Sequence, residues 1–160
     1  MKSKFETILL SGLTAGTLDI LAAVLVYSVL LKQTSAVKIL QSIASAVFRQ
    51  EAYEGGPKMA FYGLLFHYII ALIFAFIYLK LYPYFSFLKK HVFISAVIYG
   101  IFVWLVMNLV VLPIAFPKLP PKQFDFQLLL SVFILIVCIG FPIAFITKKF
   151  YIRQEQLKNI

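Results

Sequence analysis

Long apolar runs separated by short polar segments dominate the pattern of this chain. Four runs reach the roughly 20 residues that a helix needs to cross the hydrocarbon core of a bilayer. They cover residues 5–31, 59–82, 92–112 and 124–147. Because consecutive helices with short connections pack as antiparallel neighbours, we predict an all-α, integral membrane four-helix bundle. The spans use most of the 160 residues, so residues 1–160 are expected to form a single membrane domain.

The connection between the first two spans has a different pattern. Apolar side chains recur at helical spacing from Val37 to Phe48, while Lys38, Gln41 and Arg49 lie on the opposite face. This pattern predicts an amphipathic helix over residues 36–49. In so small a protein, such a helix is expected to lie in the membrane interface or to cap the bundle.

Prolines and one acidic residue mark the ends of the predicted spans. Pro57 suits the first turn of the second span, and Asp125 is placed to cap the fourth. Inside the fourth span, Gly140 and Pro142 predict a kink. The third connection is expected to be extended because of its prolines, which are Pro113, Pro117, Pro120 and Pro121.

The composition supports a membrane protein and argues against a nucleic-acid partner. Hydrophobic residues make up 62% of the chain and charged residues only 13%, which is far from the balance of a soluble domain. The formal net charge is +9, but the basic residues flank the apolar runs instead of forming one cluster. We therefore interpret them as anchors at the lipid bilayer, with no nucleic acid bound.

Lysine and arginine also set the expected orientation. The two termini and the second connection, together with Lys80 at the end of the second span, carry nine of these residues, whereas the first and third connections carry six. Basic residues are enriched on the cytoplasmic side of membrane proteins. Both termini are therefore expected to be cytoplasmic.

Three polar side chains inside the spans form the candidate functional site. Asp19 lies near the middle of the first span, where a carboxylate costs about 2.5–3.5 kcal/mol on insertion scales and therefore usually faces a partner or water. His67 on the second span is expected at a similar depth, and Asn108 on the third lies nearer the outer surface. An Asp–His pair could exchange a proton near neutral pH, or it could be a hydrogen-bonded pair that fixes the helix register. The sequence leaves both interpretations open.

A face of small residues surrounds Asp19 on the first span. Gly12, Gly16 and Ala23 share this face with Asp19, since the successive positions 12, 16, 19 and 23 are four, three and four residues apart. Gly12 and Gly16 form a GxxxG pair, which lets two helix backbones approach closely. The expected contact is packing within the chain, and the alternative is a homo-oligomer formed through the Gly12/Gly16 face.

The chain lacks the motifs of common enzyme and cofactor classes. No HExxH, CxxC, GxSxG or phosphate-binding glycine loop occurs in the sequence. The single cysteine, Cys138, excludes an intrachain disulfide and a cysteine-based zinc site. Asp19 and His67 alone are too few donors for a closed metal site. We therefore expect a protein that is not an enzyme and that binds neither a metal nor a cofactor.

Segments in every span resemble a family of small, uncharacterised four-span bacterial inner-membrane proteins. The resemblance rests on residues 14–19, 40–45, 106–108, 112–113 and 140–144, together with Gly55, Gly56, Gly63 and His67. It implies a location in the bacterial inner (cytoplasmic) membrane. It also draws attention to Asp19, His67, Asn108 and Pro142, but it supplies no activity.

Two function classes follow from these observations. The sequence slightly favours a non-enzymatic structural or partner-binding membrane component, because the two helix pairs share no internal repeat of the transporter kind. The alternative is a proton- or ion-linked small transporter or channel subunit. In that alternative, Asp19 and His67 would line a water-accessible cavity.

Overall fold

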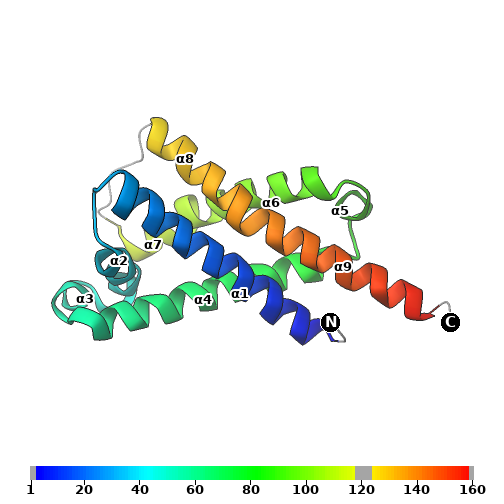
Figure 1. Cartoon of the computed structure of the whole chain (residues 1–160), viewed down its shortest axis with the longest axis horizontal. Helices are drawn as coiled ribbons and strands as arrows, with labels where there is room; N and C mark the ends of the chain where they lie inside the picture. Colours follow the sequence, from blue (N-terminus) through cyan, green and yellow to red (C-terminus); the bar gives the residue numbers. More distant parts are fainter. Residues whose placement is uncertain (1–2, 118–123, 159–160) are drawn as a thin grey trace.

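The computed structural model describes residues 3–117 and 124–158. Within these ranges the regular structure is helical, without strands, and four helical segments are long and apolar enough to cross a membrane (Figure 1). The segments are Lys4–Leu30, Gly56–Leu81, Val92–Ala115 and Phe126–Leu157. The predicted fold class is therefore confirmed, including a shorter apolar helix between the first two spans.

Several of these spans consist of more than one helical element. The first contains α1 (Lys4–Ala23) and η1 (Val24–Leu30), and the second is α4 (Gly56–Leu81). The third contains α6 (Val92–Val106), η2 (Met107–Val111) and α7 (Leu112–Ala115). The fourth contains α8 (Phe126–Leu135), η3 (Ile136–Gly140) and α9 (Phe141–Lys158). The connections hold α2 (Ala36–Phe48), α3 (Glu51–Glu54) and α5 (Ser86–Lys90).

Side-chain caps and one proline explain where three of the helices begin. The hydroxyl of Ser35 accepts a hydrogen bond from the backbone N–H of Lys38 and so starts α2, the predicted amphipathic helix. The carboxylate of Asp125 accepts one from the N–H of Leu128 over 2.9 Å, which confirms the predicted cap of the fourth span. Pro57 lies in the first turn of α4, also as predicted.

The third span continues beyond its predicted end. Pro113 lies in the first turn of α7, so the expectation that an extended segment begins there is wrong. The π-helical segment η2 immediately precedes this turn. The backbone pairing therefore changes register near the residue that lacks an N–H, which lets the helix pass through it. Lys118, Pro120, Pro121 and Lys122 lie outside the described residues.

The fourth span carries a similar irregularity where we predicted a kink. The π-helical segment η3 ends at Gly140, two residues before Pro142. Gly140 also has a packing role, because a Cβ atom there would lie 2.2 Å from the carbonyl oxygen of Ala96 on α6. The absence of a side chain at Gly140 therefore lets two helix backbones touch.

The core of the bundle lies toward the end that carries the termini. There α4 and α6 are joined by the hydroxyl of Tyr78, 3.1 Å from that of Ser95, and by the hydroxyl of Tyr99, which donates to the carbonyl of Phe74 over 2.5 Å. The rings of Tyr78 and Tyr99 meet edge to face, with centroids 4.7 Å apart. These buried contacts hold the second and third spans together at this end.

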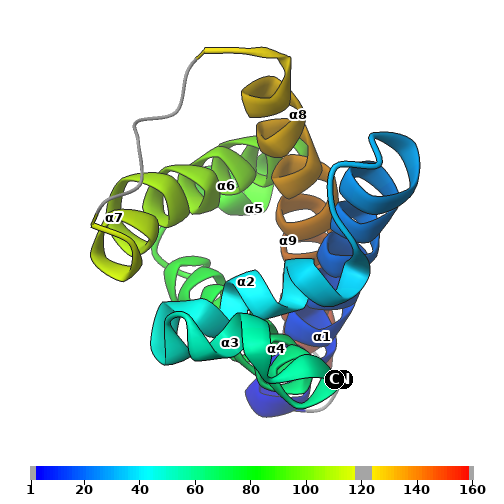
Figure 2. The same ribbon diagram turned by 90° about the vertical axis from the view of Figure 1, so that its left-hand side faces the viewer.

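The opposite end is organised by α2, which packs across α4 (Figure 2). The backbone of α2 approaches so closely that a Cβ atom on Gly63 would lie 1.9 Å from the carbonyl oxygen of Leu40. Gln41 donates to the carbonyl of Gly56 over 3.3 Å, and the ring of Phe48 stacks on that of Phe66. The amphipathic helix therefore packs on the bundle, as one of the two expected placements.

Large apolar side chains also cover the outside of every span. Leu21, Phe61, Phe93 and Phe133 are all exposed, and each belongs to a different span. Exposed apolar surface on this scale is unusual for a soluble monomer but is expected for helices that face lipid. The chain is therefore a multi-pass membrane protein.

Candidate functional site

His67 is held against the backbone of the first span. Its Nε2 lies 2.8 Å from the carbonyl oxygen of Gly16. A carbonyl oxygen can only accept, so Nε2 carries the hydrogen in this contact. The prediction that the first two spans are neighbours is confirmed by this contact.

Tyr68 extends the contact between α4 and α1. Its hydroxyl lies 2.9 Å from the hydroxyl of Thr17, and its ring would be 3.0 Å from a Cβ atom on Gly16. Tyr68 and Thr17 were not among the site residues expected from the sequence. Both could have been found from the sequence, because each places a hydroxyl group within a span, directly next to His67 or Gly16.

Asp19 lies near His67 without bonding to it. The carboxylate is close enough for electrostatic attraction to the histidine, and it is within electrostatic range of Cys138 on η3. Within the described residues, however, no hydrogen bond or ion pair joins Asp19 to another side chain. Asp19 and His67 therefore lie in one region, as predicted. The hydrogen bond of His67, however, is made with the backbone of α1 and not with Asp19.

Asn108 takes part in a separate polar contact. Its Nδ2 donates to the carbonyl of Trp104 in the same span over 2.8 Å, and its Oδ1 is buried without a hydrogen-bond partner. The indole N–H of Trp104 in turn donates to the hydroxyl of Ser131 on α8 over 2.8 Å. Among the described residues, no hydrogen bond connects Asn108 with Asp19 or His67.

The small-residue face of the first span is covered by α4. A Cβ atom on Gly12 would lie 2.7 Å from Cδ2 and 3.0 Å from Cα of Leu72, and both Gly12 and Gly16 are buried. Ala23 ends α1 and is only half-buried. The GxxxG pair thus makes the expected contact within one chain.

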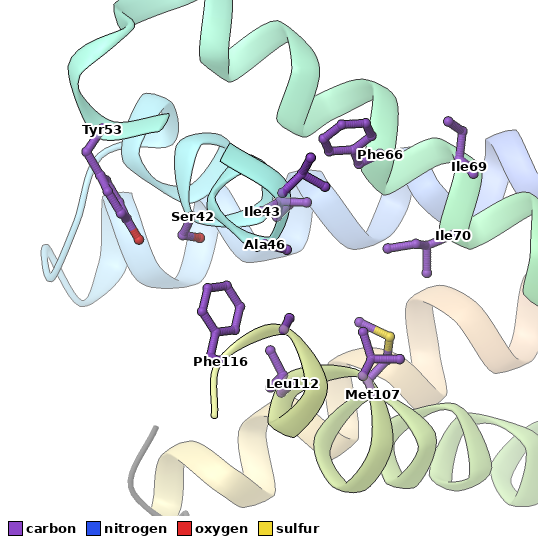
Figure 3. Close-up of a pocket in the computed structure, with 13 residues that line it drawn as sticks. Ser42, Ile43, Ala46, Tyr53, Phe66, Ile69, Ile70, Met107, Leu112 and Phe116 are labelled. Carbon is purple, nitrogen blue, oxygen red and sulfur yellow. The ribbon is translucent and has the colours of Figure 1, made fainter. Parts of the chain in front are cut away.

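A cavity of about 530 Å³ lies between α2, α4 and the end of the third span (Figure 3). Of the side chains that line it, only Ser42 and Tyr53 carry a polar group, and no charged side chain is among them. The apolar walls include Ile43 and Ala46 of α2, Phe66, Ile69 and Ile70 of α4, and Met107, Val111 and Leu112 of the third span. The cavity was not predicted from the sequence.

The cavity has a polar end and an apolar end. Figure 3 shows Tyr53 and Ser42 on one side of the space and Ile70 and Met107 on the other. At the polar end, the guanidinium of Arg49 donates to the carbonyl of Ala115, which links the end of α2 to the end of α7. The cavity thus lies between two sets of hydrogen bonds. One is the bond of Arg49 to Ala115 at the polar end, and the other is formed by Tyr78 and Tyr99 nearer the termini.

Known proteins offer no further guide to this site. No family model, curated protein or solved structure matches the chain. The function therefore has to be inferred from the arrangement of its own residues.

Proposed function

We propose that this protein is a non-enzymatic, multi-pass membrane component that binds an apolar molecule or chain between α2, α4 and α7. The observation that carries the proposal is the cavity of about 530 Å³. Small-molecule sites typically occupy about 300–1,000 Å³. The space is partly open to its surroundings, so a molecule from the membrane can enter it.

The lining favours hydrocarbon over a polar or ionic occupant. The hydroxyl of Ser42 already donates to the carbonyl of Ile39 over 2.6 Å, and that of Tyr53 lies 3.3 Å from the hydroxyl of Ser45. A polar ligand that entered this space would lose its hydration and find few partners, which is costly. A hydrocarbon group has no hydrogen bonds to water to lose, and it would gain dispersion contacts with the walls.

Filling the cavity should abolish binding. Ala46→Trp places an indole in the space that Ala46 borders, so it should exclude several methylene groups of a bound chain. At about 0.8 kcal/mol for each buried methylene, the loss of two lowers affinity by more than tenfold. The measurement is binding of a fluorescent acyl-chain probe to the purified protein, with native mass spectrometry of retained lipid.

The matched control for this variant is Leu65→Trp. Leu65 is exposed on α4 and does not line the cavity, so the same indole added there should leave binding unchanged. Wild-type affinity in Ala46→Trp would rule out this cavity as the binding site. Equal losses in both variants would point to a general effect of the added ring.

Proton-linked transport is the second candidate, and the proximity of Asp19 to His67 favours it. The contact of its N–H with the carbonyl of Gly16 instead supports a structural role for His67. The variant His67→Gln separates the two because an amide N–H can keep this bond but cannot exchange a proton.

Under the structural role, His67→Gln should retain stability, whereas His67→Leu should lose about 1 kcal/mol, a typical value for a hydrogen bond between membrane helices. Thermal unfolding in detergent measures this difference. Proteoliposomes with a pH-sensitive dye test transport in parallel, and we expect no proton flux. A flux that both His67→Gln and Asp19→Asn abolish would favour the transport function instead.

We further propose that the protein resides in a bacterial inner membrane with both termini in the cytoplasm. Support comes from the unequal distribution of basic residues. Among the described residues at the end that carries the termini are Lys4, Lys80, Lys89, Lys90, Lys148, Lys149 and Arg153. At the opposite end, Glu51 and Glu54 offset part of the positive charge.

A further inference from the structure

Arg49 has an unusual backbone conformation beside the cavity. Its φ of 54° and ψ of −130° place it in a region that residues with a side chain rarely occupy. Such a conformation persists only when the surrounding structure holds it. Here the chain turns sharply from α2 into α3, and the guanidinium reaches the carbonyl of Ala115, a residue that lines the cavity.

This position gives the cavity a cationic group at its polar end. A guanidinium has five N–H donors in a planar fork that matches a carboxylate, and the carbonyl of Ala115 is one acceptor for them. Arg49 is exposed, so its remaining donors are accessible. Glu51 and Glu54 lie close by in the chain, so recognition of an anion here depends on direct contact with Arg49 and not on a broad positive surface.

The size of the cavity decides what kind of occupant it takes. A helix about 10 Å across that rises about 5.4 Å per turn fills roughly 420 Å³ per turn. The cavity of about 530 Å³ is comparable to little more than one such turn, which favours a single flexible chain over a membrane-spanning helix of a partner protein. A single flexible hydrocarbon chain can follow the walls from Tyr53 to Ile70 and Met107.

We propose that the ligand is a fatty acid, with its hydrocarbon chain in the cavity and its carboxylate bound to Arg49. This inference rests on the proposed function and adds the chemical class of the ligand. A fatty acid fits better than a lysophospholipid because Ser42 and Tyr53, the hydroxyl-bearing side chains of the lining, already have partners within the protein. A glycerol headgroup would find few further donors or acceptors there.

The test compares oleate with oleyl alcohol, which has the same chain and no charge. Both displace a fluorescent acyl-chain probe from the full chain in detergent micelles. We expect wild type to bind oleate about tenfold more tightly, since a hydrogen bond to a charged group is worth at least that factor. Arg49→Gln should remove this preference while oleyl alcohol binds as before, which also shows that the cavity of the variant is intact.

The matched control is Lys58→Gln. It removes one positive charge at the start of α4 from a residue that does not line the cavity, so the preference for oleate should persist. Equal affinity of wild type for oleate and oleyl alcohol would overturn the fatty-acid assignment and leave hydrocarbon binding in place. An unchanged preference for oleate in Arg49→Gln would do the same. Tighter binding of lysophosphatidylglycerol than of oleate would overturn it as well. If neither chain binds to wild type, the proposed function itself fails.

Discussion

Gly63→Ala is expected to displace α2 from α4 and to cause one of the two largest losses of stability among these variants. The added Cβ atom would lie 1.9 Å from the carbonyl oxygen and 2.6 Å from the carbonyl carbon of Leu40. Both atoms belong to the backbone, so no rotamer change relieves the clash and the whole helix has to move. Overpacking typically costs about 1–3 kcal/mol, and we expect a loss at or above the top of this range. Alanine is the better helix former by about 1 kcal/mol, which does not offset the clash.

Thermal unfolding in detergent measures the change, and hydrogen exchange over residues 36–48 shows whether α2 is released. Because α2 forms one wall of the cavity, binding of the acyl-chain probe should fall as well. Gly16→Ala is the matched control. Its Cβ atom would meet the ring of Tyr68 at 3.0 Å and the Cβ of Ala71 at 3.2 Å, so shifts of a few tenths of an ångström are enough to relieve both contacts. Equal losses in both variants would contradict the role of the backbone contact at Gly63.

Gly140→Ala should have an effect of similar size at the other glycine contact of the bundle. The new Cβ atom would lie 2.2 Å from the carbonyl oxygen of Ala96, and Gly100 faces the Cα of Ile136 with only 2.5 Å for a Cβ atom. The third and fourth spans therefore meet backbone to backbone at these two glycines. We expect a loss of about 3 kcal/mol or more, because either added methyl group forces the two spans apart.

Two further variants separate this packing role from a role in bending the helix. Pro142→Ala changes the proline but leaves the contact with Ala96 intact, so its unfolding temperature should stay closer to that of wild type. The double variant Gly100→Ala/Gly140→Ala should lose less than the sum of the single losses, since both methyl groups widen one interface. A larger loss in Pro142→Ala than in Gly140→Ala would show that helix geometry, and not close packing, is the main requirement here.

The candidate site was predictable only in part. His67 could be placed beside the first span, because a polar residue within an apolar run needs a partner and the next helix supplies one. Its actual partner is the backbone carbonyl of Gly16, and a pattern of residue types does not show which carbonyl is accessible. Asn108 was expected in the same cluster but bonds within its own span, because depth along a helix says nothing about the direction that a side chain faces.

The sequence by itself determined the four spans, the amphipathic helix and the cap at Asp125, because these depend on runs and spacings of neighbouring residues. Only the tertiary structure decided the π-helical segments, the backbone contacts of Gly63 and Gly140, and the cavity. The backbone contacts and the cavity depend on the distance between helices, which local sequence does not set. Glycines draw α2 onto α4 and α6 onto the fourth span, while the Tyr78 and Tyr99 contacts join α4 to α6 at one end. The cavity is the space left beyond those contacts, and no single segment encodes it.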